Sequence, residues 1–145
     1  MTRSELLQKW KGNRSYTLKL LDALSEEYWD LRPADGVKTY GGQWSHLTTW
    51  LRTHSRFVTD VTMDKVPVKT HAEVVAALTD FFDALLAYLT TVEDDQLAEI
   101  VKVFYGKRSR AFILSVMDNH LAHHRGQVIV YQRLCGVVPV GYRGW

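Results

Sequence analysis

Four segments of this sequence repeat apolar residues at alternating steps of three and four, which is the spacing of one face of an α-helix. The first segment starts at a capping-box pattern, Thr2 followed by Glu5, and ends near Ser25. A helix-breaking cluster follows at residues 33–36. The face expected to be buried consists of Leu6, Trp10, Asn13, Thr17, Leu20 and Leu24.

The second and third segments have the same periodicity. The second runs from about Tyr40 to Val58, and the third follows a second capping-box pattern formed by Thr70 and Glu73. The connection between them is long enough to cross the molecule, so the two helices need not be simple up-and-down neighbours. Both topologies remain open at this point.

The fourth segment begins at Ser109, a good N-cap, and ends at Gly136, a good residue for the position after a helix. A short extended segment is expected before it, over residues 100–105. No internal repeat or linker interrupts the chain. The sequence therefore predicts an all-α fold, a four-helix bundle in one domain spanning residues 1–145.

Charge and cysteine content limit the class of protein. Eighteen basic residues against sixteen acidic ones give a net charge of +2, so we expect no nucleic-acid or membrane partner. The one cysteine excludes an intrachain disulfide and fits a reducing compartment. No segment suggests a signal peptide or a membrane span. These features favour a soluble, cytoplasmic protein.

The stretch NHLAHHRGQ, residues 119–127, holds three of the six histidines. At about 100° per residue, His120 and His124 lie on the apolar stripe that contains Ile113, one turn apart, whereas His123 lies about 80° to one side. Burying two imidazoles without partners costs a few kcal/mol. The pair therefore either satisfies itself within the core or binds a metal ion, as histidines at this spacing do elsewhere.

His46 on the second helix is the candidate third ligand, because facing helices of a bundle bring such side chains together. His54 cannot bind the same ion as His46, since eight residues along a helix span about 12 Å. His54 and His71 are interpreted as surface or boundary residues.

Four further residues are expected near such a site. Gln127, one turn beyond His124, either bonds a ligand imidazole or lies at the boundary with its amide in solvent. The aromatic residues Trp44, Trp50 and Tyr131 either line a pocket above the metal or belong to the core.

The remaining notable residues of the last helix are expected away from the site. Arg125, about 120° from the stripe, is expected to face solvent or a neighbouring chain, and Gly126 would allow another helix to approach closely. Asp118 lies about 140° around the helix and cannot join the histidines. Cys135 lies about 16 Å beyond His124 and is interpreted as an inert thiol.

The strings YGGQWSHL, NHLAHHRGQ and VYQRLCG, with LSEEYWDLRP upstream, resemble the DinB-like (DinB/YfiT) family of metal-dependent enzymes. The resemblance implies a four-helix bundle in which His46, His120 and His124 hold a divalent metal. Many members of the family are homodimers, and some relatives use a low-molecular-weight thiol. The family name refers to damage induction and implies no contact with DNA.

Three imidazoles without a carboxylate suit zinc or nickel, and three protein ligands leave an open position. The leading hypothesis is a metal-dependent enzyme, a thiol-dependent transferase or a hydrolase of undetermined substrate. The alternative is a non-catalytic metal-binding or dimerisation module with a structural ion. A metal-free bundle with satisfied core histidines is the third reading.

Overall fold

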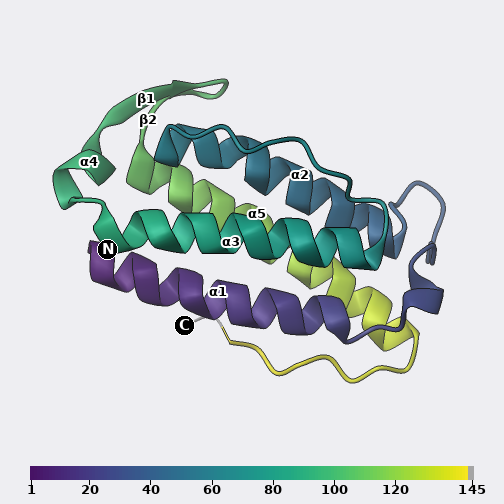
Figure 1. Cartoon of the computed structure of the whole chain (residues 1–145). Coiled ribbons are helices and arrows are strands. Elements are labelled where there is room, and N and C mark those ends of the chain that lie inside the picture. Colours follow the sequence, from purple (N-terminus) through teal and green to yellow (C-terminus); the bar gives the residue numbers. More distant parts are fainter. Residues whose placement is uncertain (144–145) are drawn as a thin grey trace.

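The computed structural model describes residues 1–143, and within them four long helices form a bundle (Figure 1). The long helices are α1 (Arg3–Asp22), α2 (Tyr40–Thr59), α3 (His71–Thr91) and α5 (Arg110–Leu134). The short elements are the 3-10 helix η1 (Glu26–Tyr28), α4 (Asp94–Ala98), β1 (Ile100–Val103) and β2 (Gly106–Ser109). The predicted all-α bundle with an extended segment before the last helix is therefore confirmed.

Capping side chains determine where the helices begin. The Thr2 hydroxyl accepts the backbone N–H of Glu5, whose carboxylate accepts the N–H of Thr2, so the predicted capping box is present. Thr70 and Glu73 form the same arrangement at α3. At the other end of the chain, α5 stops before Gly136, which has a φ of +75° that favours glycine.

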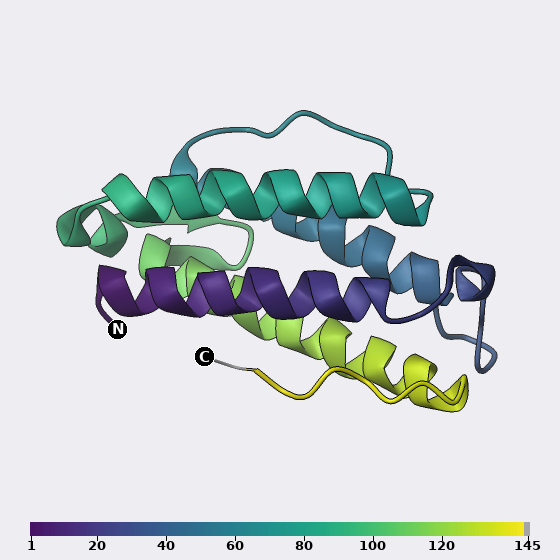
Figure 2. The same cartoon turned by 60° about the horizontal axis from the view of Figure 1, so that its bottom comes forward.

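The helices follow the crossover topology. Going around the bundle, α1 contacts α3, α3 contacts α2, and α2 contacts α5. Residues 60–70 return along the length of the molecule, so α2 and α3 run in the same direction (Figure 2). As a result α2 and α5 are antiparallel neighbours, and this pair places the histidines opposite one another.

Arg52 ties the crossover to the bundle. Its guanidinium donates to the carbonyl of Ala77 at 3.0 Å, to the carboxylate of Asp80 at 2.6 Å and to the carbonyl of Asp64 at 2.9 Å. One buried side chain thus joins α2, α3 and the returning segment. Ser45 adds a second attachment by donating to the carbonyl of Val68.

The core lies between the four helices, and its largest fully buried side chains include Trp10, Trp44, Tyr40, Phe81 and Phe82. All six residues expected on the buried face of the first helix are buried, including the polar Asn13 and Thr17.

By length and composition alone α3 could cross a membrane, so the expectation that no segment suggests a span is wrong for this helix. In the structure α3 is amphipathic. Its apolar side, with Val74 and Leu78, is buried in the bundle, and Asp80 and Asp83 lie exposed on its other side. This is the pattern of a helix that packs on a protein core.

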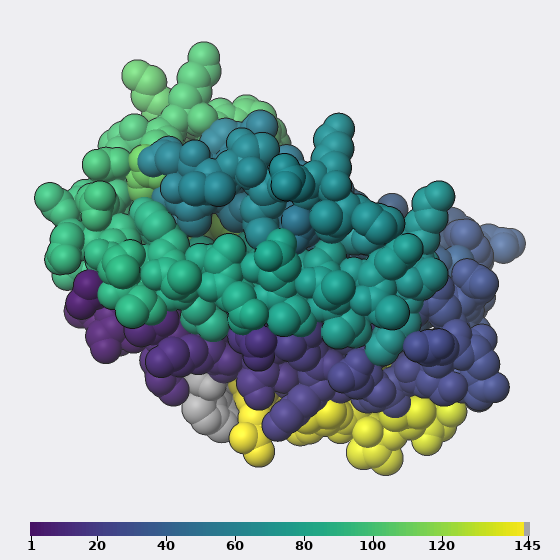
Figure 3. Space-filling view, in the orientation of Figure 1, coloured from purple at the N-terminus to yellow at the C-terminus, as the bar shows by residue number. Residues whose placement is uncertain are grey.

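Arg125 is buried, with 5% of its surface exposed, so the expectation that it faces solvent or another chain is wrong. The reason is that α5 contacts α1 as well as α2, which widens its buried arc beyond one stripe. The segment after α5 returns along α1 (Figure 3). In this segment Tyr142 packs edge-on against Tyr16.

Gly126 also differs from its expected role. A Cβ atom at this position would meet nothing within 4 Å, so no helix of the described chain approaches it. A close approach occurs instead at Gly41, where a Cβ would overlap the ring of Trp29 from the loop before α2.

Candidate metal centre

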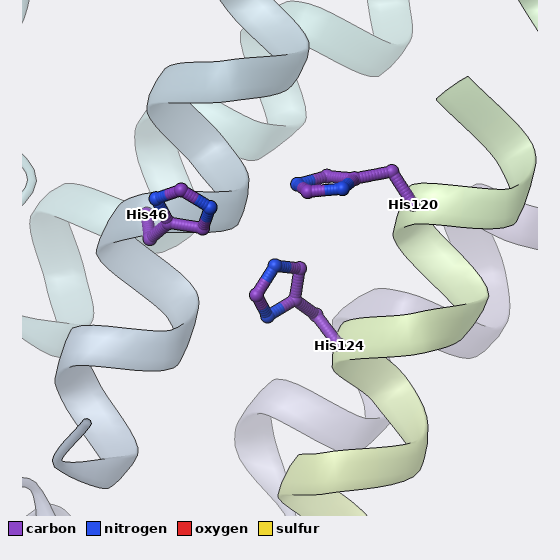
Figure 4. A group of neighbouring side chains, drawn as sticks. All are labelled: His46, His120 and His124. Carbon is purple, nitrogen blue, oxygen red and sulfur yellow. The ribbon is translucent and has the colours of Figure 1, made fainter. Parts of the chain in front are cut away.

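His46 from α2 and His120 and His124 from α5 point into one shared space between the two helices (Figure 4). One nitrogen from each ring lies within 4.8 Å of the others. The ring centroids of His120 and His124 are 4.6 Å apart, and that of His46 lies 5.6 Å and 5.0 Å from them. The structure thus brings together the three residues proposed as ligands from the sequence.

An amide from α2 orients the ring of His124. Gln43 Nε2 lies 2.6 Å from Gln127 Oε1 and 3.2 Å from the Tyr131 hydroxyl, which itself donates to the carbonyl of Lys38 at 2.6 Å. Because the nitrogen of Gln43 donates in these contacts, its oxygen accepts from His124 Nδ1 at 2.8 Å. The proton of neutral His124 is then on Nδ1, and the lone pair of Nε2 is available to a metal.

The ring of His120 is held by stacking. It lies 4.0 Å from the indole of Trp50, whose other face stacks on His54 at 3.6 Å. Nε2 of His120 is buried and has no hydrogen-bond partner. A buried polar atom without a partner is costly, and coordination of a metal would use its lone pair.

Burial is the largest cause of a lowered pKa in all three histidines. The pKa of His120 falls to about 4 and that of His124 to about 3, with repulsion from neighbouring histidines as the next cause. The pKa of His46 is also lowered, by burial and then by the charge of Lys38. All three rings are therefore neutral near pH 7, which is the form that binds metal ions.

The donor set fits a late first-row divalent ion. Three imidazole nitrogens suit zinc or nickel better than magnesium or calcium, which prefer oxygen ligands. Among residues 1–143 no carboxylate joins this group. Asp118 lies elsewhere, as expected, and contacts Asn13 at 2.8 Å and Lys9 at 3.0 Å.

The three histidines open onto a cavity of about 630 Å³. Its other lining residues are Gln43, His123, Gln127 and the loop of residues 36–38. Trp44, Trp50 and Tyr131 do not line it, so of the two alternatives for these aromatics the pocket lining does not apply to this cavity. Trp44 is a core residue, Trp50 stacks on His120, and Tyr131 bonds the amide of Gln43.

His54 is buried, with 5% of its surface exposed, so its interpretation as a surface or boundary residue is wrong. Trp50 covers one side of its ring, and Phe57 and Phe104 approach it edge-on at 5.8 Å. Phe104 belongs to the turn of the hairpin, and sequence periodicity does not place that turn over α2. His71 is partly exposed beside Asp22, as expected.

Gln43 is the residue that sequence reasoning missed. It lies three positions before His46, on the same side of α2, and this proximity is visible in the sequence. Its contact with His124, 81 residues away in the chain, cannot be seen in the sequence. Gln127 contacts Gln43 and, through Nε2, His123 at 2.7 Å.

Comparison with known proteins identifies relatives of this chain. The model of the DinB family matches residues 1–144. A DinB-like protein from Bacillus cereus ATCC 10987 is 25% identical, with 96% of each chain covered and a TM-score of 0.81.

Two further solved structures have the same fold. A DinB-like protein from Bacillus subtilis is 15% identical, with a TM-score of 0.78 over 95% of this chain and 96% of that one. A candidate DinB-family member from Exiguobacterium sibiricum 255-15 is 20% identical, with a TM-score of 0.74 over 99% and 97%. No curated protein matches the sequence. The match over almost the whole length of the sequence shows that the chain belongs to the DinB family.

Proposed function

We propose that the protein is a divalent-metal-dependent enzyme in which His46, His120 and His124 bind zinc or nickel. The reaction is the transfer of a group with a low-molecular-weight thiol as co-substrate, or a hydrolysis. The observation that carries the proposal is that the three imidazoles converge at the wall of a cavity of about 630 Å³, and not inside a sealed core. Catalytic metal sites have this form, with three protein ligands and one open position.

When bound, the ion would supply Lewis-acid chemistry that lowers the pKa of a water or a thiol at the open position. The protein's own residues prepare that position. Gln43 keeps the proton of His124 on Nδ1, and Trp50 restrains the ring of His120 by stacking. The cavity supplies the space for a small-molecule substrate.

The metal content of untagged protein tests the binding site. We expect about one divalent ion per chain in the unmodified protein and less than a tenth of that in a His46→Ala, His124→Ala double variant. Far-ultraviolet circular dichroism shows whether the variant remains folded. A His71→Ala variant is the matched control, because it removes a histidine that contacts Asp22 and Trp29 and none of the proposed ligands. Equal metal in the double variant and the unmodified protein would rule out the site.

A structural ion is the second candidate function, favoured by the burial of His124 and by the origin of the ligands from two adjacent helices. An ion with that role stabilises the α2–α5 pair and leaves no position for substrate. Cobalt substitution separates the two. A change in the cobalt absorption spectrum on adding azide supports the open site, whereas an unchanged spectrum, with a thermal midpoint that drops on chelation, supports the structural ion.

We further propose that the protein is a homodimer and acts in the cytoplasm, without a nucleic-acid or membrane partner. The exposed apolar residues Phe112, Val130 and Leu134 on α5 support an interface with a second copy. Light scattering coupled to gel filtration measures the molecular mass, and a mass near 16.7 kDa would contradict the dimer.

A further inference from the structure

The charge of the cavity lining is one-sided. Among its lining residues Lys38 carries the one permanent charge, and none is an aspartate or a glutamate. Lys38 is exposed, and in the part of the chain that the structure describes it forms no ion pair. Its ammonium group is therefore available to a molecule that enters the cavity.

The backbone at Lys38 is fixed relative to the histidines. Its carbonyl accepts from the hydroxyl of Tyr131 at 2.6 Å, and that hydroxyl accepts from Gln43, which contacts His124. Arg32 donates to the neighbouring carbonyl of Val37. The charge of Lys38 also contributes, after burial, to the lowered pKa of both His46 and His124.

The amides of Gln43 and Gln127 also determine which ring nitrogen of His123 accepts a hydrogen bond. Gln127 Oε1 accepts from Gln43, so Gln127 Nε2 is its donor and lies 2.7 Å from Nε2 of His123. Nε2 of His123 is then the acceptor in this contact. His123, which lines the cavity, thus has Nδ1 as its hydrogen-bond donor.

We infer that the cavity selects a small carboxylate as substrate or co-substrate, with the carboxylate at Lys38 and the reacting atom at the open metal position. The inference rests on the proposed function, since it needs that open position. A single lysine provides one point charge, which matches a carboxylate better than a phosphate ester that carries nearly two charges. A divalent ion held by three neutral ligands adds to the positive potential.

Three thiols with the same two-carbon spacer test the inference on cobalt-substituted protein. 3-Mercaptopropionate is anionic at its far end, 2-mercaptoethanol is neutral and cysteamine is cationic. Binding is measured by the sulfur-to-cobalt charge-transfer absorption. For each thiol the dissociation constant of Lys38→Met is divided by that of the unmodified protein, which cancels the different acidities of the thiols.

We expect the ratio to be about 5 for 3-mercaptopropionate, near 1 for 2-mercaptoethanol and below 1 for cysteamine. The value of about 5 is the largest change in affinity that a partly solvated charge pair usually contributes. High salt should move all three ratios toward 1. Lys102→Met, an equal charge change on exposed β1 outside the cavity lining, is the matched control and should leave every ratio near 1.

Equal ratios for the three thiols in Lys38→Met would overturn the selection of a carboxylate and leave the open metal site standing. If none of the three thiols changes the absorption spectrum, the open metal position itself is ruled out, and this inference fails with it. Cobalt content and circular dichroism of Lys38→Met are measured alongside, and both should equal those of the unmodified protein because the side chain is exposed.

Discussion

Helix α5 carries two buried polar clusters that begin at adjacent residues and differ in kind. His124 faces α2, whereas Arg125 faces α1, and each is only 5% exposed. On the α1 side, Arg125 donates to Asn13 at 2.9 Å, and Asn13 donates to Asp118 at 2.8 Å. The α1 cluster, defined as Lys9, Asn13, Asp118 and Arg125, is thus a chain of paired donors and acceptors.

On the α2 side the pairing is left incomplete. The amide of Gln43 satisfies one nitrogen of His124, and Nε2 of His120 has no partner although it is buried. The comparison teaches that burial of polar groups does not by itself mark a functional site. A cluster whose donors meet acceptors stabilises the fold, and one whose lone pairs converge beside a cavity is suited to bind an ion.

The largest expected effect comes from breaking the α1 cluster. Asn13→Leu removes the partner of the buried Arg125 guanidinium, so we expect it to lower the free energy of unfolding by about 3 kcal/mol. Chemical denaturation measures this loss. Metal affinity should stay within about twofold of the unmodified protein, because the cluster does not contact the histidines.

Lys9→Ala is the control within the same cluster. The Lys9 side chain is 29% exposed, so its ion pair with Asp118 should contribute less than about 1 kcal/mol. Equal costs for Asn13→Leu and Lys9→Ala, or a loss of metal in Asn13→Leu, would contradict the division of α5 into a structural side and a binding side.

The next largest effect is expected on the α2 side. Gln43→Leu removes the acceptor that keeps the proton of His124 on Nδ1, and loss of such a contact weakens metal binding by about 10- to 100-fold. Competition with a chromophoric chelator measures the affinity. Gln127→Leu removes an amide that contacts Gln43 and His123 but none of the three proposed ligands, and we expect it to weaken binding by less than about threefold. An unchanged affinity in Gln43→Leu would show that Gln43 does not position His124.

Acid should destabilise the metal-free protein through the α2 side. Burial lowers the pKa of His120 to about 4 and that of His124 to about 3, from a value of 6.5 in the unfolded chain. Between these values the unfolded chain binds more protons than the folded one, so stability is fully present above pH 6.5 and is lost as the pH falls toward 4. Thermal midpoints measured in chelator from pH 7.5 to 4.5 test this.

A His120→Gln, His124→Gln variant should lose less of its thermal midpoint over the same pH range, because it lacks the two groups that titrate. Parallel pH profiles for the variant and the unmodified protein would assign the acid sensitivity to other residues.

The smallest effect is expected at Gly126, on the exposed side of α5 between the clusters. Alanine is the better helix former and meets nothing within 4 Å, so Gly126→Ala should stabilise the protein by about 0.5–1 kcal/mol. Gly41→Ala is the opposite case, because its Cβ would overlap Trp29, and it should destabilise the protein. A destabilised Gly126→Ala would indicate that a second copy of the chain packs on this glycine.

The sequence predicted what depends on local spacing. Thr2 and Glu5 identified the start of α1, Gly136 the end of α5, and the i, i+4 pair the orientation of His120 and His124 toward the core. These predictions hold because capping and helical periodicity involve residues within one or two turns of each other.

Predictions about contacts between different helices were less accurate than those about a single helix. Arg125 was expected outside because one apolar stripe was taken as the whole buried arc, and α1 covers its flank. His54 was expected near the surface because nothing local shows that Phe104 of the hairpin lies over it. Gln43 carried no signal of its contact with His124.

The sequence by itself thus determined the four long helices, where they begin, and the choice of His46, His120 and His124 as candidate ligands. The tertiary structure decided the crossover that makes α2 and α5 antiparallel neighbours, the amide that orients His124, and the cavity with Lys38 at its wall. The physical reason is that periodicity places a side chain on a face of its own helix, whereas hydrogen bonds and cavities arise between helices, where residues far apart in the chain meet.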